Sequence, residues 1–263
     1  MLKSPGPVAL EAGPITIYWY GITLAIAFLA GLLITFKIAK KQGENPDKIL
    51  NLAIFLLFGA IIGARLYFVM FNWGFYKFHL QEIFMTWHGG LSIHGAIIGG
   101  FITGAIYTKI NKLPLLKYAD LVSPGLILGQ AIGRWGNFFN SEAFGVPTNL
   151  PWKLYIPVEN RPENYMNYQY FHPTFLYESL WNITVFLLLF FIFRKKFEGK
   201  NGALFFLYLI LYSLGRFVIE SIRTDSIYMV AGIPIAQFVS IIFIITGILG
   251  LYFVKKYTNF AGH

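Results

Sequence analysis

The 263-residue chain contains no cysteine. The fold therefore uses no disulfide, and any thiol chemistry must use a thiol that a substrate supplies. Charged residues are also scarce, at 13%, whereas 56% of the residues are hydrophobic and 19% are aromatic. With a mean hydropathy of +0.59, the chain has too little polar surface for a soluble globule. The composition predicts a polytopic membrane protein.

Seven apolar stretches are long enough to cross a bilayer. They lie at about residues 15–36, 49–71, 91–107, 119–139, 174–193, 203–221 and 233–254. An odd number of spans places the two termini on opposite sides of the membrane. We therefore expect an all-α fold of seven transmembrane helices, forming a single integral membrane domain over residues 1–263.

The orientation follows from the Lys and Arg residues of the connections. Thirteen of them fall in one alternating set (residues 37–48, 109–117, 194–200 and 255–256), and five fall in the other. Because the more basic set marks the cytoplasmic side, the N-terminus should lie outside and the C-terminus in the cytoplasm. The net charge of +9 is then explained by topology and needs no nucleic-acid partner. The first span is too long for a signal-peptide core, so no cleaved signal is expected.

The connection over residues 140–171 is long and carries four prolines among several aromatic residues. We expect it to form a small external cap. Glycines at four-residue spacing in the third and fourth spans predict close helix packing. The two halves show no matching pattern of broken helices, which disfavours an inverted-repeat transporter.

Three arginines lie inside hydrophobic spans, each one or two residues after a glycine: Arg65, Arg134 and Arg216. A guanidinium in a bilayer costs from a few to more than about ten kcal/mol, so each needs an anionic partner or a polar cavity. Together they predict that a negatively charged ligand binds between the helices.

Five polar clusters fall toward the outer leaflet once the spans are oriented. They are WYG at residues 19–21, HGGLSIHG at 88–95, GRWGNFFNSEAFG at 133–145, HPTFLYE at 172–178 and YSLGRFVIESIR at 212–223. Separate structural needs would hardly place all five at one depth. A shared site is therefore the better hypothesis.

The sixth span carries Tyr212, Arg216, Glu220 and Arg223 at spacings of four, four and three residues, which places them on one helical face. An alternative is an internal ion pair between Arg216 and Glu220 that serves helix packing alone. That alternative explains Glu220 better than Arg216, because an arginine kept only for packing is costly in lipid.

Arg134 and Asn137 share a helical face, and Asn140 and Glu142 follow where that helix should end. A polar helix cap would explain Asn140 and Glu142. It would not explain Arg134, whose planar fork suits a phosphate.

His94 has no His, Cys or paired acid at a metal-ligand spacing, so no metal site is expected. A histidine side chain can act as a general base near neutral pH, and His94 suits a packing residue equally well.

These motifs resemble one family. The segment GRWGNFFNSEAFG is similar to the signature of the prolipoprotein diacylglyceryl transferases, and the other four clusters occur in the order typical of that family. The resemblance spans residues 18–223. It implies an enzyme of the bacterial cytoplasmic membrane, with its active site toward the outer leaflet. Two departures are His88, where some members carry Asp, and Phe175, where some carry Gln.

The resemblance also implies the reaction and its substrates. The family transfers the diacylglyceryl group of phosphatidylglycerol to the lipobox cysteine thiol of a prolipoprotein signal peptide, forming a thioether and releasing glycerol phosphate. This reaction is the first step of lipoprotein maturation and uses no cofactor or metal. The implied catalytic residues are His94, Tyr212 and Arg216. The implied substrate-binding residues are Tyr20, Arg134, Asn137, Asn140, Glu142, Gly145, Glu220 and Arg223.

The chemistry agrees with the residues present. A base, His94 or alternatively Tyr212, should deprotonate a thiol with a pKa of about 8.5, and cations should stabilise the departing phosphate. Arg134 and Arg216 are the expected phosphate ligands, whereas Arg65 is expected only to shape the cavity. A lipid or anion transporter would need polar groups at successive depths through both leaflets, and a lipid-binding scaffold would have no need for His94.

Overall fold

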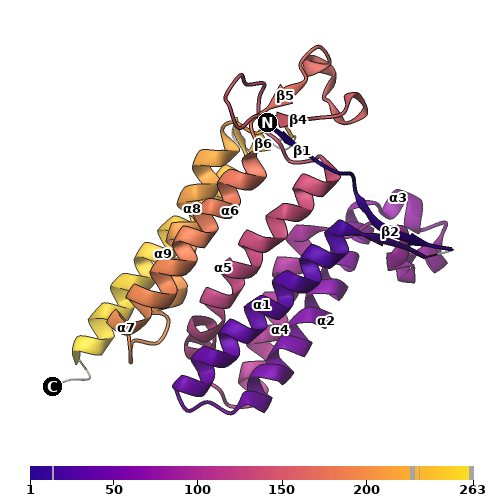
Figure 1. Ribbon diagram of the computed structural model, residues 1–263. Coiled ribbons are helices and arrows are strands. Elements are labelled where there is room, and N and C mark those ends of the chain that lie inside the picture. The colour runs from indigo at the N-terminus through magenta and orange to yellow at the C-terminus, as the bar shows by residue number, and fades with distance from the viewer. Residues whose placement is uncertain (14, 226–228, 231, 261–263) are drawn as a thin grey trace. The chain divides into compact units, whose positions relative to one another are not determined.

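The computed structural model describes residues 1–13, 15–225, 229–230 and 232–260. The chain divides into two compact units, each described separately below. The first unit comprises residues 1–35 and 119–263, and the second comprises residues 36–118. The labels of all elements follow Figure 1.

Six helical segments among the described residues are long and apolar enough to cross a membrane. They are α1 (Trp19–Lys41), α2 (Pro46–Phe71), α4 (Ile93–Ile110), the continuous segment Thr174–Lys196, α8 (Ala203–Glu220) and α9 (Ile235–Phe260). The segment Thr174–Lys196 contains α6 (Thr174–Leu187), a π-helical stretch (Leu188–Phe193) and α7 (Arg194–Lys196). This is the architecture of a polytopic helical membrane protein.

The remaining predicted span, residues 119–139, lies within the 26-residue helix α5 (Leu115–Asn140). This helix is long enough to cross a bilayer but is not among the six apolar segments. Its sequence is more polar than theirs because it includes Asp120, Gln130 and Arg134.

Short strands correct the all-α prediction. The expected first span began at Ile15, but residues Ile15–Tyr18 form β3, which pairs antiparallel with β2 (Val8–Ala12). Three β-branched residues and a tyrosine in this stretch favour a strand over a helix. Two further strands, β6 (Met229–Val230) and β7 (Ile233–Pro234), pair just before α9.

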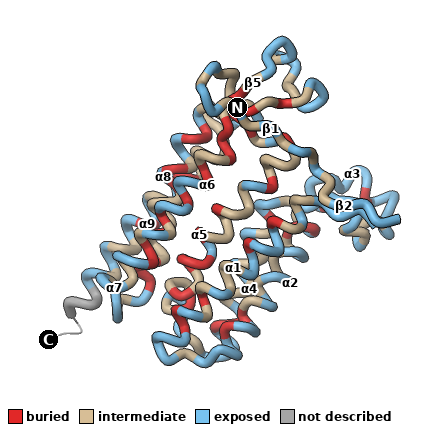
Figure 2. Tube along the Cα trace, viewed as in Figure 1, coloured by how far each residue is buried: buried red, intermediate tan, exposed pale blue. Residues whose placement is uncertain are grey.

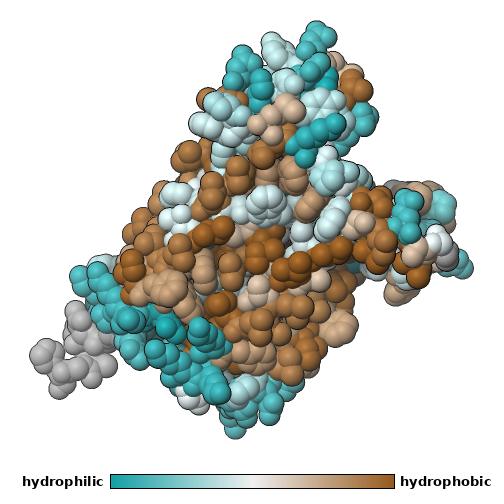
Figure 3. Space-filling model, in the orientation of Figure 1, coloured by the Kyte–Doolittle hydropathy of each residue, from teal (hydrophilic) through white to brown (hydrophobic). Residues whose placement is uncertain are grey.

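In the first unit, the connection over residues 140–171 folds around its own apolar centre. Its strands β4 (Leu154–Tyr155) and β5 (Tyr170–Phe171) join β1 (Leu2–Lys3) in a three-stranded sheet. Phe144, Ile156 and Phe175 are buried against these strands. Hydrophilic residues gather over this end of the unit, whereas hydrophobic residues cover its helices (Figure 3).

The helices of the first unit are held by close contacts and by a cap. Gly31 of α1 and Gly125 of α5 pack so closely that a Cβ on Gly31 would lie 2.7 Å from the carbonyl oxygen of Gly125. The carboxylate of Asp120 accepts hydrogen bonds from the backbone N–H groups of Gly202 (2.6 Å) and Phe205 (2.7 Å). It thereby caps the N-terminus of α8, where N–H groups lack helical partners. Buried residues follow the facing sides of α6 and α8 (Figure 2).

In the second unit, α2 and α4 pack through facing glycines. A Cβ on Gly99 would lie 2.9 Å from the Cα of Gly63 and would also overlap the carbonyl oxygen of Gly59. The close packing predicted from the glycine spacing is thus confirmed for both the third and the fourth span. Along the chain, α2 is followed by α3 (Trp73–Tyr76) and by two 3-10 helices, Leu80–Phe84 and Thr86–His88, before α4 begins.

Gly99→Ala is expected to destabilise the second unit by about 1–3 kcal/mol, because the new methyl group must push α2 and α4 apart. Gly100→Ala is the matched control, since a Cβ there would meet only the Cβ of Ala60, at 4.0 Å. Thermal unfolding of both variants in detergent measures the difference. Equal midpoints for the two variants would refute the glycine contact.

Candidate functional site

A buried carboxylate, Glu178, lies at the centre of an ionic cluster in the first unit. It is in the second turn of α6 and its residue is only 2% exposed. Its Oε2 lies 2.6 Å from Nη2 of Arg134. Its Oε1 lies 3.0 Å from Nη1 of Arg216 and 3.1 Å from Nη1 of Arg223. One carboxylate therefore joins three guanidinium groups from two other segments of the chain.

Two more carboxylates complete this cluster. Nη2 of Arg216 lies 2.5 Å from Oε2 of Glu220, so the ion pair considered as the alternative for these two residues does form. Arg223 donates from Nε and Nη2 to the two carboxylate oxygens of Asp225, at 2.9 and 2.5 Å. Although burial of Arg223 favours its neutral form, these bonds and the charges of Glu178 and Glu220 raise its pKa above the ordinary value. Arg223 is thus held charged and bonded within the protein.

Arg134 is the most accessible arginine of the cluster. Its side chain is 22% exposed, against 16% for Arg216 and 9% for Arg223. Its Nη1 makes only a long contact of 3.5 Å with the Oδ1 of Asn137, and the described residues offer no partner for its Nε. Arg134 therefore retains N–H donors that can bind an anionic ligand.

The chain leaves α5 through an unusual backbone conformation. Ser141 and Ala143 have φ values of 53° and 55°, in the left-handed region that residues with a Cβ rarely adopt. Between them lies the exposed Glu142, whose Oε1 accepts a hydrogen bond of 2.8 Å from Nδ2 of Asn137. Such strained residues cluster at ligand-binding sites, where the surrounding structure holds them in place.

Gly145 joins three segments at the cluster. Its N–H donates to the carbonyl oxygen of His172 at 2.9 Å, and the next N–H, of Val146, donates to that of Ile222 at 2.8 Å. A Cβ on Gly145 would lie 2.8 Å from the oxygen of Ile222 and 2.9 Å from the Cβ of His172. Only glycine allows this approach, which ties the segment after α5 to the start of α6 and the end of α8.

Three other predicted site residues also belong to the first unit. The ring of Tyr20 packs on Gly136, where a Cβ would lie 2.7 Å from its Cδ2. Asn140 ends α5, and its carbonyl oxygen accepts a hydrogen bond from the side chain of Asn160 at 3.2 Å. Tyr212 precedes Arg216 by one turn of α8 and stacks on Tyr208, with ring centroids 5.9 Å apart.

The remaining predicted residue, His94, belongs to the second unit. It lies in the first turn of α4, where it is exposed, and its ring stacks on Tyr67 of α2 at a centroid distance of 6.0 Å. Within the described part of the chain, no three His, Asp or Glu side chains converge to hold a metal ion.

Glu178 is the last residue of the HPTFLYE motif, and the sequence alone assigned it no role. The available signal was its position, because it is the only acidic residue of the predicted span over residues 174–193. A carboxylate in a bilayer needs a partner, just as the arginines do. Glu178 needs a cationic partner and Arg134 and Arg216 need an anionic one, so the sequence could have identified Glu178 as their partner.

The fold and this cluster define an integral membrane protein with a buried, arginine-rich polar site. Residues 7–253 match the family described as prolipoprotein diacylglyceryl transferase, and the chain belongs to that family. This confirms the family predicted from the sequence motifs.

Several curated relatives match over nearly the whole chain, and each is named phosphatidylglycerol–prolipoprotein diacylglyceryl transferase. The protein of Nostoc sp. is 53% identical over 255 residues, which cover 95% of this chain and 90% of the relative. That of Thermosynechococcus vestitus is 53% identical over 250 residues, covering 95% and 92%. That of Acaryochloris marina is 50% identical over 259 residues, covering 97% and 94%.

Proposed function

We propose that this protein transfers the diacylglyceryl group of phosphatidylglycerol to the lipobox cysteine of a prolipoprotein, which makes it a transferase of lipoprotein biosynthesis. The observation that carries the proposal is the near full-length match to relatives named for this activity. The arginine cluster supplies a chemical basis for it. No feature of the described residues favours an arginine-lined transporter.

The reaction requires attack by the cysteine sulfur on the carbon of the diacylglyceryl group that carries the phosphate oxygen. The C–O bond breaks, its electron pair stays on the oxygen, and glycerol phosphate departs. The phosphodiester has one negative charge, and a second develops on the departing oxygen. Arg134 is suited to stabilise this charge because it retains N–H donors, and charge-assisted bonds to an oxyanion strengthen as the charge grows.

The other residues of the cluster have supporting roles in this proposal. Glu178 holds the guanidinium groups of Arg134, Arg216 and Arg223 in one place, because three like charges would otherwise repel. Arg216 shares the phosphate with Arg134. The remaining substrate-binding residues are Tyr20, Asn137, Asn140, Glu142, Gly145, Glu220 and Arg223.

We assign the role of general base to His94, with Tyr212 as the alternative. The exposure of His94 at the start of α4 leaves its ring free to accept the thiol proton. The cysteine must come from the substrate, because this chain has none.

We further propose that α5 is a seventh span of one integral membrane domain over residues 1–263, with the N-terminus outside a bacterial cytoplasmic membrane. In the first unit, the basic helix α7 follows Glu178 by sixteen residues of continuous helix, which corresponds to about 24 Å. If α7 faces the cytoplasm, as its three basic residues indicate, the ionic cluster lies toward the outer leaflet. Residues 140–171 then form an external cap.

The test of this function combines purified protein, phosphatidylglycerol and a synthetic peptide containing a lipobox cysteine. We expect mass spectrometry to detect a diacylglyceryl adduct on the cysteine, and none on a control peptide in which that cysteine is serine. Absence of the adduct with the cysteine peptide would overturn the assignment.

A further inference from the structure

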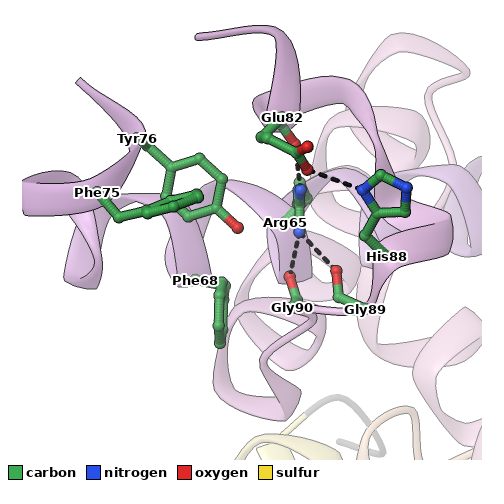
Figure 4. Close-up of a pocket in the computed structure, with 8 residues that line it drawn as sticks. All are labelled: Arg65, Phe68, Phe75, Tyr76, Glu82, His88, Gly89 and Gly90. Atoms are coloured by element: carbon green, nitrogen blue, oxygen red, sulfur yellow. Dashed lines mark hydrogen bonds and ion pairs between the residues drawn. The ribbon is translucent and has the colours of Figure 1, made fainter. Parts of the chain in front are cut away.

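The guanidinium of Arg65 in the second unit is enclosed by backbone carbonyl groups. Nε donates to the oxygen of Ile83 at 2.9 Å, and Nη1 donates to those of Gly89 (2.6 Å) and Gly90 (2.9 Å). Nη2 donates to the oxygens of Glu82 and Met85. Figure 4 shows the guanidinium directed at Gly89 and Gly90. We call these five carbonyl groups, of residues 82, 83, 85, 89 and 90, the carbonyl cage.

The carbonyl cage excludes Arg65 as a ligand for a phosphate. An arginine has five N–H donors, and the cage accepts five hydrogen bonds. The residue is 5% exposed, and partial negative charges surround its guanidinium. The adjoining pocket of about 330 Å³ is lined by aromatic rings and by Glu82 and His88, whose side chains pair with each other at 2.9 Å. An anion there would meet no free donor of Arg65.

Gly89 and Gly90 adopt the backbone conformation that the cage requires. Their φ values of 87° and 75° lie in the left-handed region, which glycine adopts at little cost. A Cβ on Gly90 would lie 2.6 Å from Nη1 of Arg65 and 2.8 Å from the ring of Phe68. The two glycines thus let the chain turn against α2 while both carbonyl oxygens face the guanidinium.

The caged segment leads directly into the helix that carries His94. Two residues after Gly90, the N–H of Ser92 donates to the carbonyl oxygen of Ala64 at 3.1 Å, and α4 begins at the next residue. Arg65 and Ala64 together therefore fix the path of the chain over the last few residues before His94.

We propose that Arg65 is a positioning residue that fixes the start of α4, and hence the ring of His94, for proton transfer. This proposal rests on the proposed function only in one respect, the assignment of His94 as the base that accepts the thiol proton. Arg65 acts through the carbonyl cage and contacts no substrate. Its loss should therefore lower turnover while leaving the binding of phosphatidylglycerol unchanged.

The first test compares wild-type protein with Arg65→Lys, in which three donors on a flexible stem replace the five-donor fork. We expect kcat to fall by about 100-fold, the effect of a misplacement of about 1 Å, with KM for phosphatidylglycerol within a factor of two. A rise in KM at unchanged kcat would overturn the proposal, because that is the signature of a lost lipid contact. Glu82→Gln is the matched control, since it removes the carboxylate in the pocket but keeps the backbone carbonyl in the cage.

A second variant ensures that the conclusion does not depend on a single mutation. A second measurement, hydrogen–deuterium exchange, tests the position of α4 without measuring activity. Gly90→Ala retains Arg65 but disturbs the cage, and should reproduce the kcat effect. Hydrogen–deuterium exchange of intact protein should show faster exchange over residues 89–96 in both variants and wild-type exchange over α8. Unchanged exchange at the start of α4 would overturn the role of Arg65. If wild-type protein forms no adduct but exchange at α4 increases in the variants, the proposed function fails while the positioning of α4 by Arg65 stands.

Discussion

Replacing Arg134 by alanine is expected to lower the rate of diacylglyceryl transfer by at least about 100-fold, the cost of removing one donor from a developing oxyanion. The reason is geometric, because Arg134 combines a fixed position beside Glu178 with unused N–H donors and is the most accessible arginine of its cluster. Lysine at this position should not restore the rate, since a point charge cannot replace a planar fork that must reach both a carboxylate and a phosphate. Adduct formation measured by mass spectrometry gives the rates.

The matched control for Arg134→Lys is Arg194→Lys, the same exchange at the opposite end of the first unit. It should leave the rate close to that of wild-type protein. Wild-type turnover in Arg134→Lys would refute a forked phosphate contact.

Glu178→Gln is expected to produce the largest loss of stability. The substitution preserves the shape of the side chain but leaves three partly buried guanidinium groups without the buried carboxylate that they share. Removing one partner of a buried ion pair costs about 3–5 kcal/mol, because the remaining charge stays desolvated. The thermal midpoint should therefore fall clearly, and turnover should fall with it as Arg134 and Arg216 lose their common position.

Thermal unfolding in detergent checks this expectation. Glu159→Gln, which removes an exposed carboxylate in the connection over residues 140–171, serves as the control and should leave the midpoint unchanged. A wild-type midpoint in Glu178→Gln would show that the carboxylate does not hold the cluster together.

Much of the helical framework could be predicted from hydrophobicity alone. Six of the predicted spans correspond to helices of the described residues that are apolar enough to cross a membrane, because runs of about twenty apolar residues are specified locally. The remaining predicted span, residues 119–139, lies in the more polar helix α5, and its crossing of the membrane stays a prediction. The strand at Ile15–Tyr18 could not be recognised in this way, since an apolar stretch continuous with a helix carries no periodicity that marks the boundary. The paired strands of the connection over residues 140–171 depend on β1, about 150 residues away in sequence, and no local pattern records that pairing.

The candidate site shows the same division. The spacing of Arg216 and Glu220 was sufficient to raise their ion pair as an alternative, because both lie on one helix. The binding partners of the three intramembrane arginines were not predictable in this way. Arg134 and Arg216 share Glu178 across helices, whereas Arg65 binds only backbone carbonyl groups. That Arg65 shapes the cavity stays a prediction, whereas the exclusion of Arg65 as an anion ligand required the positions of residues 82–90.

The central claim is that the protein catalyses attack of a thiol on the carbon that joins the diacylglyceryl group of phosphatidylglycerol to its phosphate, with cleavage of the bond between this carbon and the phosphate oxygen. Phosphatidylglycerol labelled with ¹⁸O at the oxygen between that carbon and phosphorus tests it directly. The claim predicts that the lipobox peptide gains a diacylglyceryl group in thioether linkage and that all of the label appears in the released glycerol phosphate. A peptide without this adduct, or glycerol phosphate without the label, would contradict it.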